Sequence, residues 1–172
     1  MYTFVTGGYR SGRSNYALRR ASELGQPPWL YVSTGQETEE SVRKRIERHR
    51  RDVEAIWRRR VMPGDLLELL TPQALDGVGA AVIDGVADWL EERLASGVGE
   101  GALLESMAAL ADRAYRSPVP VVITTTELGM GLIPRDEGER RLLRVVASAN
   151  QSLSELAAGV VLMVSGVPCK VR

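Results

Sequence analysis

The sequence has few of the residues that mark secreted, membrane-spanning or metal-rich proteins. Its 172 residues include one cysteine, Cys169, and one histidine, His49. A single cysteine cannot form a disulfide within the chain, which agrees with a reducing compartment. No apolar run approaches the ~20 residues that a membrane-spanning helix needs, and residues 1–6 lead into a glycine loop rather than a signal-peptide core. These absences predict a cytoplasmic protein without a membrane span.

The chain also lacks an excess of charge of either sign. Lysine and arginine together number 22, as do aspartate and glutamate. A neutral balance argues against a dedicated binder of nucleic acid or of another polyanion. Hydrophobic residues make up 44% of the chain and charged residues 26%. With this length and composition we expect a single soluble domain over residues 1–172 with a sizeable core.

Short apolar runs bounded by turn residues recur along the chain. Each run is almost wholly apolar rather than alternating, which is typical of strands covered on both faces. We expect strands at residues 2–6, 29–34, 80–84, 120–125 and 159–165. Helical patterns lie between them: one from Ser14 to Leu24, one with the apolar face Leu103, Met107, Leu110 and Ala111, and one with the apolar face Leu142, Val146, Ala149, Leu153 and Leu156. Residues 94–101 read as a flexible connection. This alternation predicts an α/β fold with a mostly parallel, doubly wound sheet flanked by helices.

The segment TGGYRSGRS, residues 6–14, directly follows the first expected strand. It matches the phosphate-binding pattern Gly-x-x-x-x-Gly-Lys-Ser/Thr, except that Arg13 stands in the place of the lysine. Glycines allow the backbone to wrap around a phosphate, and the following helix adds the positive end of its dipole. We therefore predict a P-loop NTPase-like (RecA-like) domain. We expect its loop to bind a nucleotide through Gly7, Gly8, Tyr9, Arg10, Ser11, Gly12, Arg13 and Ser14. The alternative is a tight glycine turn without a ligand.

Because Arg13 replaces the lysine of the pattern, the sequence predicts nucleotide binding more firmly than phosphoryl transfer. A guanidinium keeps the positive charge, but it is larger than an ammonium and is aimed differently. A loop shaped around lysine could place Arg13 poorly for the outer phosphates. We expect the hydroxyl of Ser14 to contact Mg²⁺, and Asp84, at the end of an apolar strand, to hold the same ion through water.

Residues Glu37–Arg60 carry acidic side chains at their start and basic ones at their end, a distribution that suits the dipole of a helix. His49 lies on the apolar stripe of this expected helix. Taken alone, such a histidine is more often a core or boundary residue than a catalyst. The arginine cluster could be a solvated face, a funnel for triphosphate or a stripe that binds nucleic acid. Periodicity does not choose among these.

Several segments together resemble one known family. They are the opening loop VTGGYRSGRS, then YVST, RIERHR and Trp57 in order, then VIDGVADWL, TELGMGLIP, ANQSLSELA and VSGVPCKVR. In this combination the chain resembles adenosylcobinamide kinase / adenosylcobinamide-phosphate guanylyltransferase of cobalamin biosynthesis, over essentially its whole length.

The resemblance implies two reactions in one site. A nucleoside triphosphate, GTP or ATP, phosphorylates adenosylcobinamide, and GTP then transfers GMP onto that phosphate through a guanylylated histidine. His49 matches the nucleophile, and a neutral imidazole is competent in that role near pH 7. Arg48 and Arg50 could stabilise charge on the triphosphate. The resemblance also implies nucleotide contacts from Ser33, Thr34, Gly35 and Asp84, and a homo-oligomer, typically a trimer. Glu127, at the end of an expected strand, could serve the nucleotide, metal or substrate; the alternative is a partly exposed turn carboxylate. Asn150 and Gln151 match the family as well, but packing explains them equally.

The chain departs from the family pattern at several polar positions. They are Arg13 for the loop lysine, Val61 for an acidic residue, Thr126 for an asparagine, Arg144 for an aspartate, and Gly85-Val86-Ala87 for a Cys-x-Thr segment. A diverged paralogue that binds nucleotide without turnover, in a regulatory or assembly role, is therefore the alternative to an active enzyme.

Overall fold

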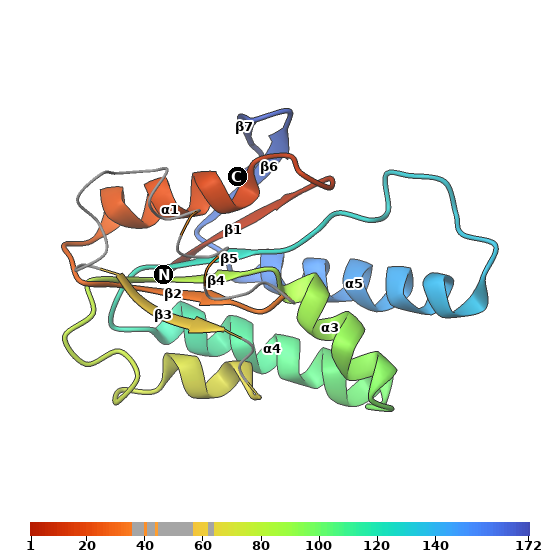
Figure 1. Ribbon diagram of the computed structural model, residues 1–172, viewed down its shortest axis with the longest axis horizontal. Helices are drawn as coiled ribbons and strands as arrows, with labels where there is room; N and C mark the ends of the chain where they lie inside the picture. The colour runs from red at the N-terminus through yellow and green to blue at the C-terminus, as the bar shows by residue number, and fades with distance from the viewer. Residues whose placement is uncertain (36–39, 41–43, 45–56, 62–63) are drawn as a thin grey trace.

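A seven-stranded sheet forms the centre of the computed structural model, which describes residues 1–35, 40, 44, 57–61 and 64–172 (Figure 1). The strands are β1 (Tyr2–Gly7), β2 (Trp29–Ser33), β3 (Trp57–Val61), β4 (Ala80–Asp84), β5 (Val121–Thr124), β6 (Gly159–Val164) and β7 (Val167–Lys170). Their order across the sheet is β3-β2-β4-β5-β1-β6-β7. All neighbours pair in parallel except β6 and β7, which are antiparallel. The expected α/β fold with a mostly parallel sheet is confirmed.

Helices cover both faces of this sheet because alternate side chains of its strands point to opposite sides. In β4, Ala80 and Val82 belong to one buried cluster, whereas Ala81 and Ile83 belong to the other. Helix α1 (Arg13–Leu24) packs on the first face. Helices α3 (Val86–Ala95), α4 (Glu100–Arg116) and α5 (Glu137–Glu155) and the short 3₁₀ helix η1 (Leu66–Leu70) cover the second, larger core (Figure 1).

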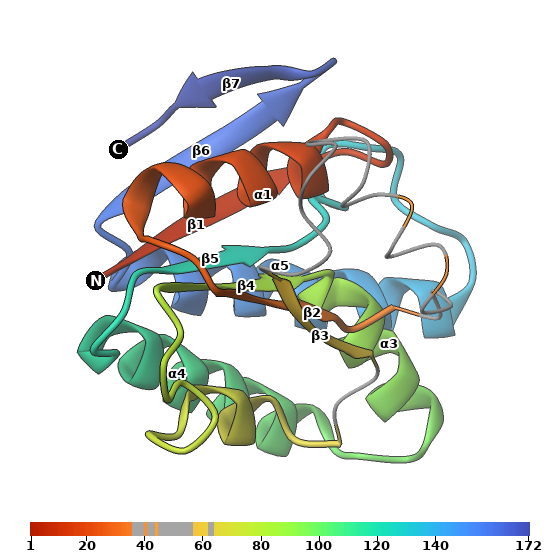
Figure 2. The ribbon, with the colours of Figure 1, turned by 60° about the vertical axis from the view of Figure 1, so that its left-hand side comes forward.

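The two edges of the sheet are finished differently. At one edge, β3 is held to β2 by parallel pairing and by packing of Trp57 on Trp29, with ring centroids 5.1 Å apart. The Trp57 ring also meets Tyr31 edge-on, an arrangement that aromatic pairs favour. At the other edge lies the β6–β7 hairpin, seen in blue in Figure 2. All four residues of β7 are exposed.

The five expected strands are confirmed, with ends shifted by at most a few residues. The expected helix over Glu37–Arg60 is wrong at its C-terminal end, because residues 57–60 belong to strand β3. Pairing with β2 and burial of Trp57 override the helical pattern there. The rest of that helix lies outside the described residues, apart from Glu40 and Lys44, both helical. The expected flexible connection over 94–101 is shorter than predicted, because α3 ends at Ala95 and α4 begins at Glu100.

Candidate nucleotide site

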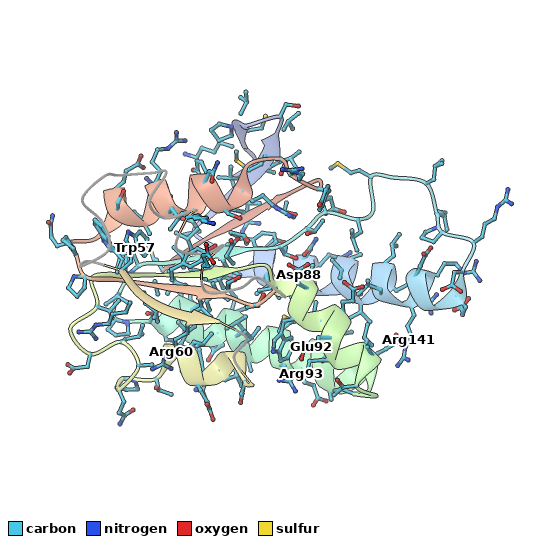
Figure 3. The ribbon with its side chains drawn as sticks, viewed as in Figure 1. Trp57, Arg60, Asp88, Glu92, Arg93 and Arg141 are labelled. Atoms are coloured by element: carbon cyan, nitrogen blue, oxygen red, sulfur yellow. The ribbon has the colours of Figure 1, made fainter. Side chains whose placement is uncertain are left out.

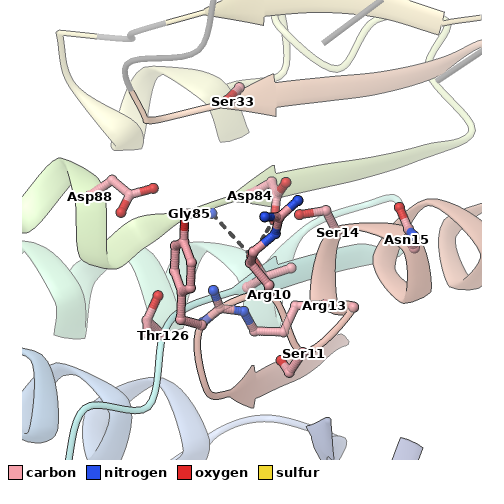
Figure 4. Close-up of a pocket in the computed structure, with 13 residues that line it drawn as sticks. Arg10, Ser11, Arg13, Ser14, Asn15, Ser33, Asp84, Gly85, Asp88 and Thr126 are labelled. Carbon is pink, nitrogen blue, oxygen red and sulfur yellow. Dashed lines mark hydrogen bonds between the residues drawn. The ribbon is translucent and has the colours of Figure 1, made fainter. Parts of the chain in front are cut away.

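The carboxyl ends of four strands meet at one edge of the sheet, above the start of α1. In register, Ser33 of β2 lies beside Asp84 of β4, and Asp84 lies beside Thr124 of β5. A pocket of about 570 Å³ opens there (Figure 4). It is lined by Tyr9, Arg10, Ser11, Gly12, Arg13, Ser14, Asn15, Ser33, Asp84, Gly85, Asp88, Thr124 and Thr126. In an open parallel sheet this edge is where ligands bind.

The glycine loop is shaped by conformations and close contacts that exclude a side chain. Gly7 has φ of 151°, and a Cβ at this position would lie 2.5 Å from the carbonyl oxygen of Met163. Gly12, with φ of 96°, is the N-cap of α1. The amide of Gly166, in the β6–β7 turn, donates to the carbonyl of Ser11 at 2.9 Å. The hairpin thus supports the loop from behind, and the N-terminus of α1 remains directed at the pocket.

Arg13 is half-buried beneath the loop. Its Nη1 donates to the carbonyl of Gly7 at 2.8 Å and to the carbonyl of Thr125 at 2.7 Å. Burial lowers the pKa of the Arg13 guanidinium from its ordinary value, while the charges of Asp84 and Asp88 oppose that shift. The group stays protonated at neutral pH, since arginine is not deprotonated in proteins.

Arg10 lies at the outer part of the same loop. Its backbone has φ of 54°, a left-handed conformation that is uncommon for a residue with a side chain. Arg10 is exposed, and its side chain lines the pocket with that of Arg13. The two guanidinium groups of the loop therefore occupy different environments, one exposed and one half-buried.

Asp84 is the buried acid of the pocket, with 5% of its surface exposed. Tyr31 donates its hydroxyl to Oδ2, and Thr124 donates its hydroxyl to Oδ1. Both bonds fix the carboxylate at the strand end. Ser14, at the start of α1, lines the same pocket. A hydroxyl and a carboxylate are suitable oxygen donors for Mg²⁺, which keeps several waters and binds mainly to substrate phosphates. The residues present fit that ion.

Asp88 is a pocket residue that the sequence analysis missed. It lies in the first turn of α3, whose N-cap is Gly85 with φ of 95°, and Figure 3 shows it at the helix end nearest the strand ends, with Glu92 and Arg93 further along. The available signal was its position four residues after Asp84, one helical turn into a helix that starts where a strand ends.

The second predicted strand end contributes one lining residue and one structural link. Ser33 lines the pocket. The hydroxyl of Thr34 donates to the carbonyl of Asp84 at 3.1 Å and to that of Gly85, so Thr34 joins the ends of β2 and β4. Gly35 lies behind the pocket, where a Cβ would approach the carboxylate of Asp88.

Glu127 lies beside the pocket rather than among its lining residues. Its backbone amide donates to the carbonyl of Gly7 at 2.9 Å. Its carboxylate accepts from the amide of Gly129 at 2.7 Å and from Nδ2 of Asn150 at 3.2 Å. These bonds order the turn after β5. The bond from Asn150 links α5 to this turn, which gives a structural reason for the agreement of Asn150 with the family pattern.

His49 and Arg50 lie outside the described residues. The structure describes the pocket walls from the glycine loop, α1, β2, β4, β5 and α3, whereas the predicted nucleophile has no described position. Within the described part of the chain, no group of three or more histidine, cysteine, aspartate or glutamate side chains is placed to hold a metal ion. No helix among the described residues is long and apolar enough to cross a membrane.

Comparison with known proteins identifies the relatives of this chain. Residues 3–171 match the family described as cobinamide kinase / cobinamide phosphate guanyltransferase. The bifunctional adenosylcobalamin biosynthesis protein CobU of Salmonella typhimurium (strain LT2) is 29% identical over 187 residues, and that of Escherichia coli (strain K12) is 28% identical over 184 residues. Both alignments cover 100% of each chain. The bifunctional adenosylcobalamin biosynthesis protein CobP of Pseudomonas aeruginosa is 29% identical over 179 residues, covering 100% of this chain and 98% of that protein.

The fold also resembles that of a solved ATPase. A prototypical ATPase from the type III secretion system of pathogenic bacteria aligns with a TM-score of 0.53 and 13% sequence identity. The alignment covers 94% of this chain, which spans half the length of that ATPase. This likeness agrees with the expected α/β fold, a mostly parallel sheet flanked by helices, and carries no functional meaning.

Proposed function

Because the chain belongs to the cobinamide kinase / cobinamide phosphate guanyltransferase family, we propose that it phosphorylates adenosylcobinamide and then transfers GMP from GTP to the new phosphate, in cobalamin biosynthesis. The observation that carries this proposal is the glycine loop at the carboxyl ends of the strands, which directs the start of α1 at a polar pocket. We place the activity in the cytoplasm and in one P-loop domain formed by residues 1–172.

In the first reaction, the substrate hydroxyl oxygen forms a bond to the γ-phosphorus while the bond from that phosphorus to the β–γ bridging oxygen breaks. The nucleoside diphosphate leaves, and the hydroxyl proton goes to solvent or to a nearby carboxylate. The loop amides and the N-terminus of α1 stabilise charge on the phosphate oxygens. Asp84 is fixed by Tyr31 and Thr124, so it holds its position while the substrate binds. We assign Mg²⁺ to Ser14 and Asp84; when bound, it would neutralise charge on the phosphates.

In the second reaction, we propose that an imidazole nitrogen of His49 attacks the α-phosphorus of GTP and that pyrophosphate leaves. A phosphate oxygen of adenosylcobinamide phosphate then attacks the same phosphorus, and the bond to the imidazole breaks. A neutral imidazole suits both steps, because it is nucleophilic near pH 7 and becomes a good leaving group once phosphorylated. We assign Arg50 to the triphosphate and Ser33, which lines the pocket, to a nucleotide contact; Thr34 and Glu127 order the backbone around the site.

We also propose that the chain acts as a homo-oligomer, a trimer by family resemblance, with the site near a subunit boundary. The turn that follows β5 supports this proposal, since it carries exposed apolar side chains. Met130 is 75% exposed, Leu132 is 96% exposed and Ile133 is 78% exposed. Such a group on a surface loop suits contact with a neighbouring subunit.

A second candidate is a diverged paralogue that binds nucleotide without turnover. The observation that favours it is the position of Arg13, whose Nη1 is bonded to two backbone carbonyls. In this candidate, Nη1 of Arg13 is committed to the backbone and is not available to the transferred phosphoryl group. This candidate predicts GTP binding by calorimetry with no phosphorylated or guanylylated product.

Labelling with GTP tests the proposed function. The protein is incubated with Mg²⁺ and GTP carrying ³²P at the α-phosphate, then denatured and examined for bound label. We expect label that is stable to alkali and lost in acid, as a phosphoramidate is. His49→Ala should abolish it, and Arg116→Gln, at the opposite end of the strands, should retain it. Addition of adenosylcobinamide phosphate should discharge the label into a small product. GTP binding without label would favour the paralogue, and absence of GTP binding would overturn both candidates.

A further inference from the structure

The two arginines of the glycine loop differ in what their guanidinium groups contact. Nη1 of Arg13 carries two hydrogens and bonds two carbonyls, those of Gly7 and Thr125. Gly7 ends β1, and Thr125 directly follows β5, its neighbour in the sheet. Arg13 therefore joins two adjacent strand ends beneath the loop. The carbonyl of Gly7 also accepts from the amide of Glu127, so the cost of turning Nη1 to a phosphate falls mainly on the buried carbonyl of Thr125.

Arg10 has none of these ties. Within the described part of the chain, its side chain makes no hydrogen bond or ion pair, and it is exposed at the rim of the pocket. In Figure 4 its guanidinium points toward the side of the pocket that carries Asp84, whereas the side chain of Arg13 runs toward Thr126. The backbone of Arg10 is held in a left-handed conformation. Such conformations persist where the surroundings impose them, and they cluster at ligand-binding sites.

Resting on the proposed function only in taking a triphosphate as the ligand, we propose a division of roles between these residues. Arg10 supplies the cation that binds the outer phosphates, in place of the usual P-loop lysine. Arg13 is a structural brace that holds the ends of β1 and β5 together under the loop. The chemistry of the side chains agrees: a guanidinium has five donors in a rigid fork, which suits both the bridging of two fixed carbonyls and bidentate contact with phosphate.

Substitution at the two positions should separate binding from stability. Arg10→Gly removes the cation and supplies the residue that adopts this backbone conformation most readily. We expect the melting temperature of the ligand-free protein to stay the same or rise, while the dissociation constants for GTP and for inorganic triphosphate increase about tenfold or more. Arg10→Lys should retain most of the affinity.

Arg13→Gln should give a different pattern. Loss of the brace removes the Arg13 donor from the buried carbonyl of Thr125 and the link between the two strand ends, so we expect the ligand-free protein to melt about 3 °C or more below wild type. Arg116→Gln removes one positive charge at the end of α4 and serves as the matched control. We expect it to leave triphosphate affinity unchanged.

The readouts are calorimetric titration with GTP and with inorganic triphosphate, and thermal unfolding without ligand. Wild-type affinity in Arg10→Gly would overturn the role of Arg10. An unchanged melting temperature in Arg13→Gln, combined with weakened triphosphate binding, would overturn the role of Arg13. If the wild-type chain bound neither GTP nor triphosphate, the proposed function would fall, and with it the role of Arg10. Triphosphate binding without guanylylation would leave this division of roles standing while the proposed function failed.

Discussion

At the scale of single residues, the pocket depends on a glycine with no room for a side chain. A Cβ on Gly7 would lie 2.5 Å from the backbone oxygen of Met163 and 2.8 Å from Oγ of Ser11. Because the backbone oxygen cannot rotate away as a flexible side chain could, the loop itself would have to shift.

We therefore expect Gly7→Ala to lower the free energy of unfolding by about 1 to 3 kcal/mol and to abolish GTP binding. Denaturant unfolding and calorimetry measure the two effects. Gly101→Ala, in the first turn of α4 with open space around its Cβ, should be neutral or stabilising. A Gly7→Ala protein with wild-type stability and affinity would contradict this account of the loop.

Tyr2, at the start of β1, gives a prediction about pH. Its side chain is 2% exposed, and its hydroxyl donates to the carbonyl of Leu153 at 2.6 Å. Burial raises the pKa of Tyr2 from 10.0 to about 12. As the pH rises, the unfolded chain therefore loses the hydroxyl proton of Tyr2 before the folded chain does. The contribution of protonated Tyr2 to the free energy of unfolding is complete below pH 10 and is lost as the pH rises toward about 12.

The loss over that window should be roughly 2 to 3 kcal/mol of unfolding free energy. Tyr2→Phe should remove this part of the pH dependence and cost about 1 kcal/mol at neutral pH, through the lost hydrogen bond. Denaturant unfolding at several pH values measures both. Tyr115→Phe, at an exposed tyrosine, should keep the wild-type dependence of the unfolding free energy on pH. If Tyr2→Phe kept it too, the assignment to Tyr2 would be wrong.

At the scale of elements, α5 begins with a side-chain cap. Oδ1 of Asp136 accepts from the amide of Glu139 at 2.9 Å, which satisfies a backbone donor that the helix cannot. We expect Asp136→Ala to lower the free energy of unfolding by about 1 kcal/mol. Asp136→Asn should keep most of the wild-type stability, because an asparagine oxygen can accept the same hydrogen bond. Urea unfolding distinguishes them. Equal losses in both variants would point to the charge at the helix start rather than to the cap.

The elements that the sequence predicted are those with a strong local pattern. Strands β1, β2, β4, β5 and β6 are almost continuous apolar runs, and helix α4 buries Leu103, Met107 and Leu110 at helical spacing, so these patterns were sufficient. Strand β3 was mistaken for helix because its residues after Trp57 are basic, and its conformation follows from pairing with β2. The exposed edge strand β7 likewise has no apolar pattern to indicate it.

In the candidate site, too, the sequence predicted the residues that belong to a strong local pattern. The glycine loop directly follows β1 and Asp84 ends β4, and both line the pocket. The contacts of Arg13 could not be predicted, because one of its partners, the carbonyl of Thr125, is 112 residues away in sequence. Asp88 faces the pocket only through the direction of α3, which local sequence does not determine.

At the scale of the whole molecule, the proposed trimer predicts a dependence on the exposed turn after β5. We expect the native protein to sediment with three times the mass of the 18.8 kDa chain. The double substitution Leu132→Asp and Ile133→Asp should shift it to a smaller species, because charged groups oppose burial in an interface. Far-ultraviolet circular dichroism should remain unchanged. A wild-type protein that sediments as a monomer would refute the trimer.

The position of β1 also bears on when the binding loop can take its shape during synthesis. This strand is synthesised before both of its neighbours, β5 and β6, and the loop that follows it is supported by Gly166 of the β6–β7 turn. A growing polypeptide that has left the ribosome only as far as α4 holds the loop sequence without either neighbouring strand. The nucleotide binding that we propose would therefore arise late in translation, once residues 121–166 have emerged.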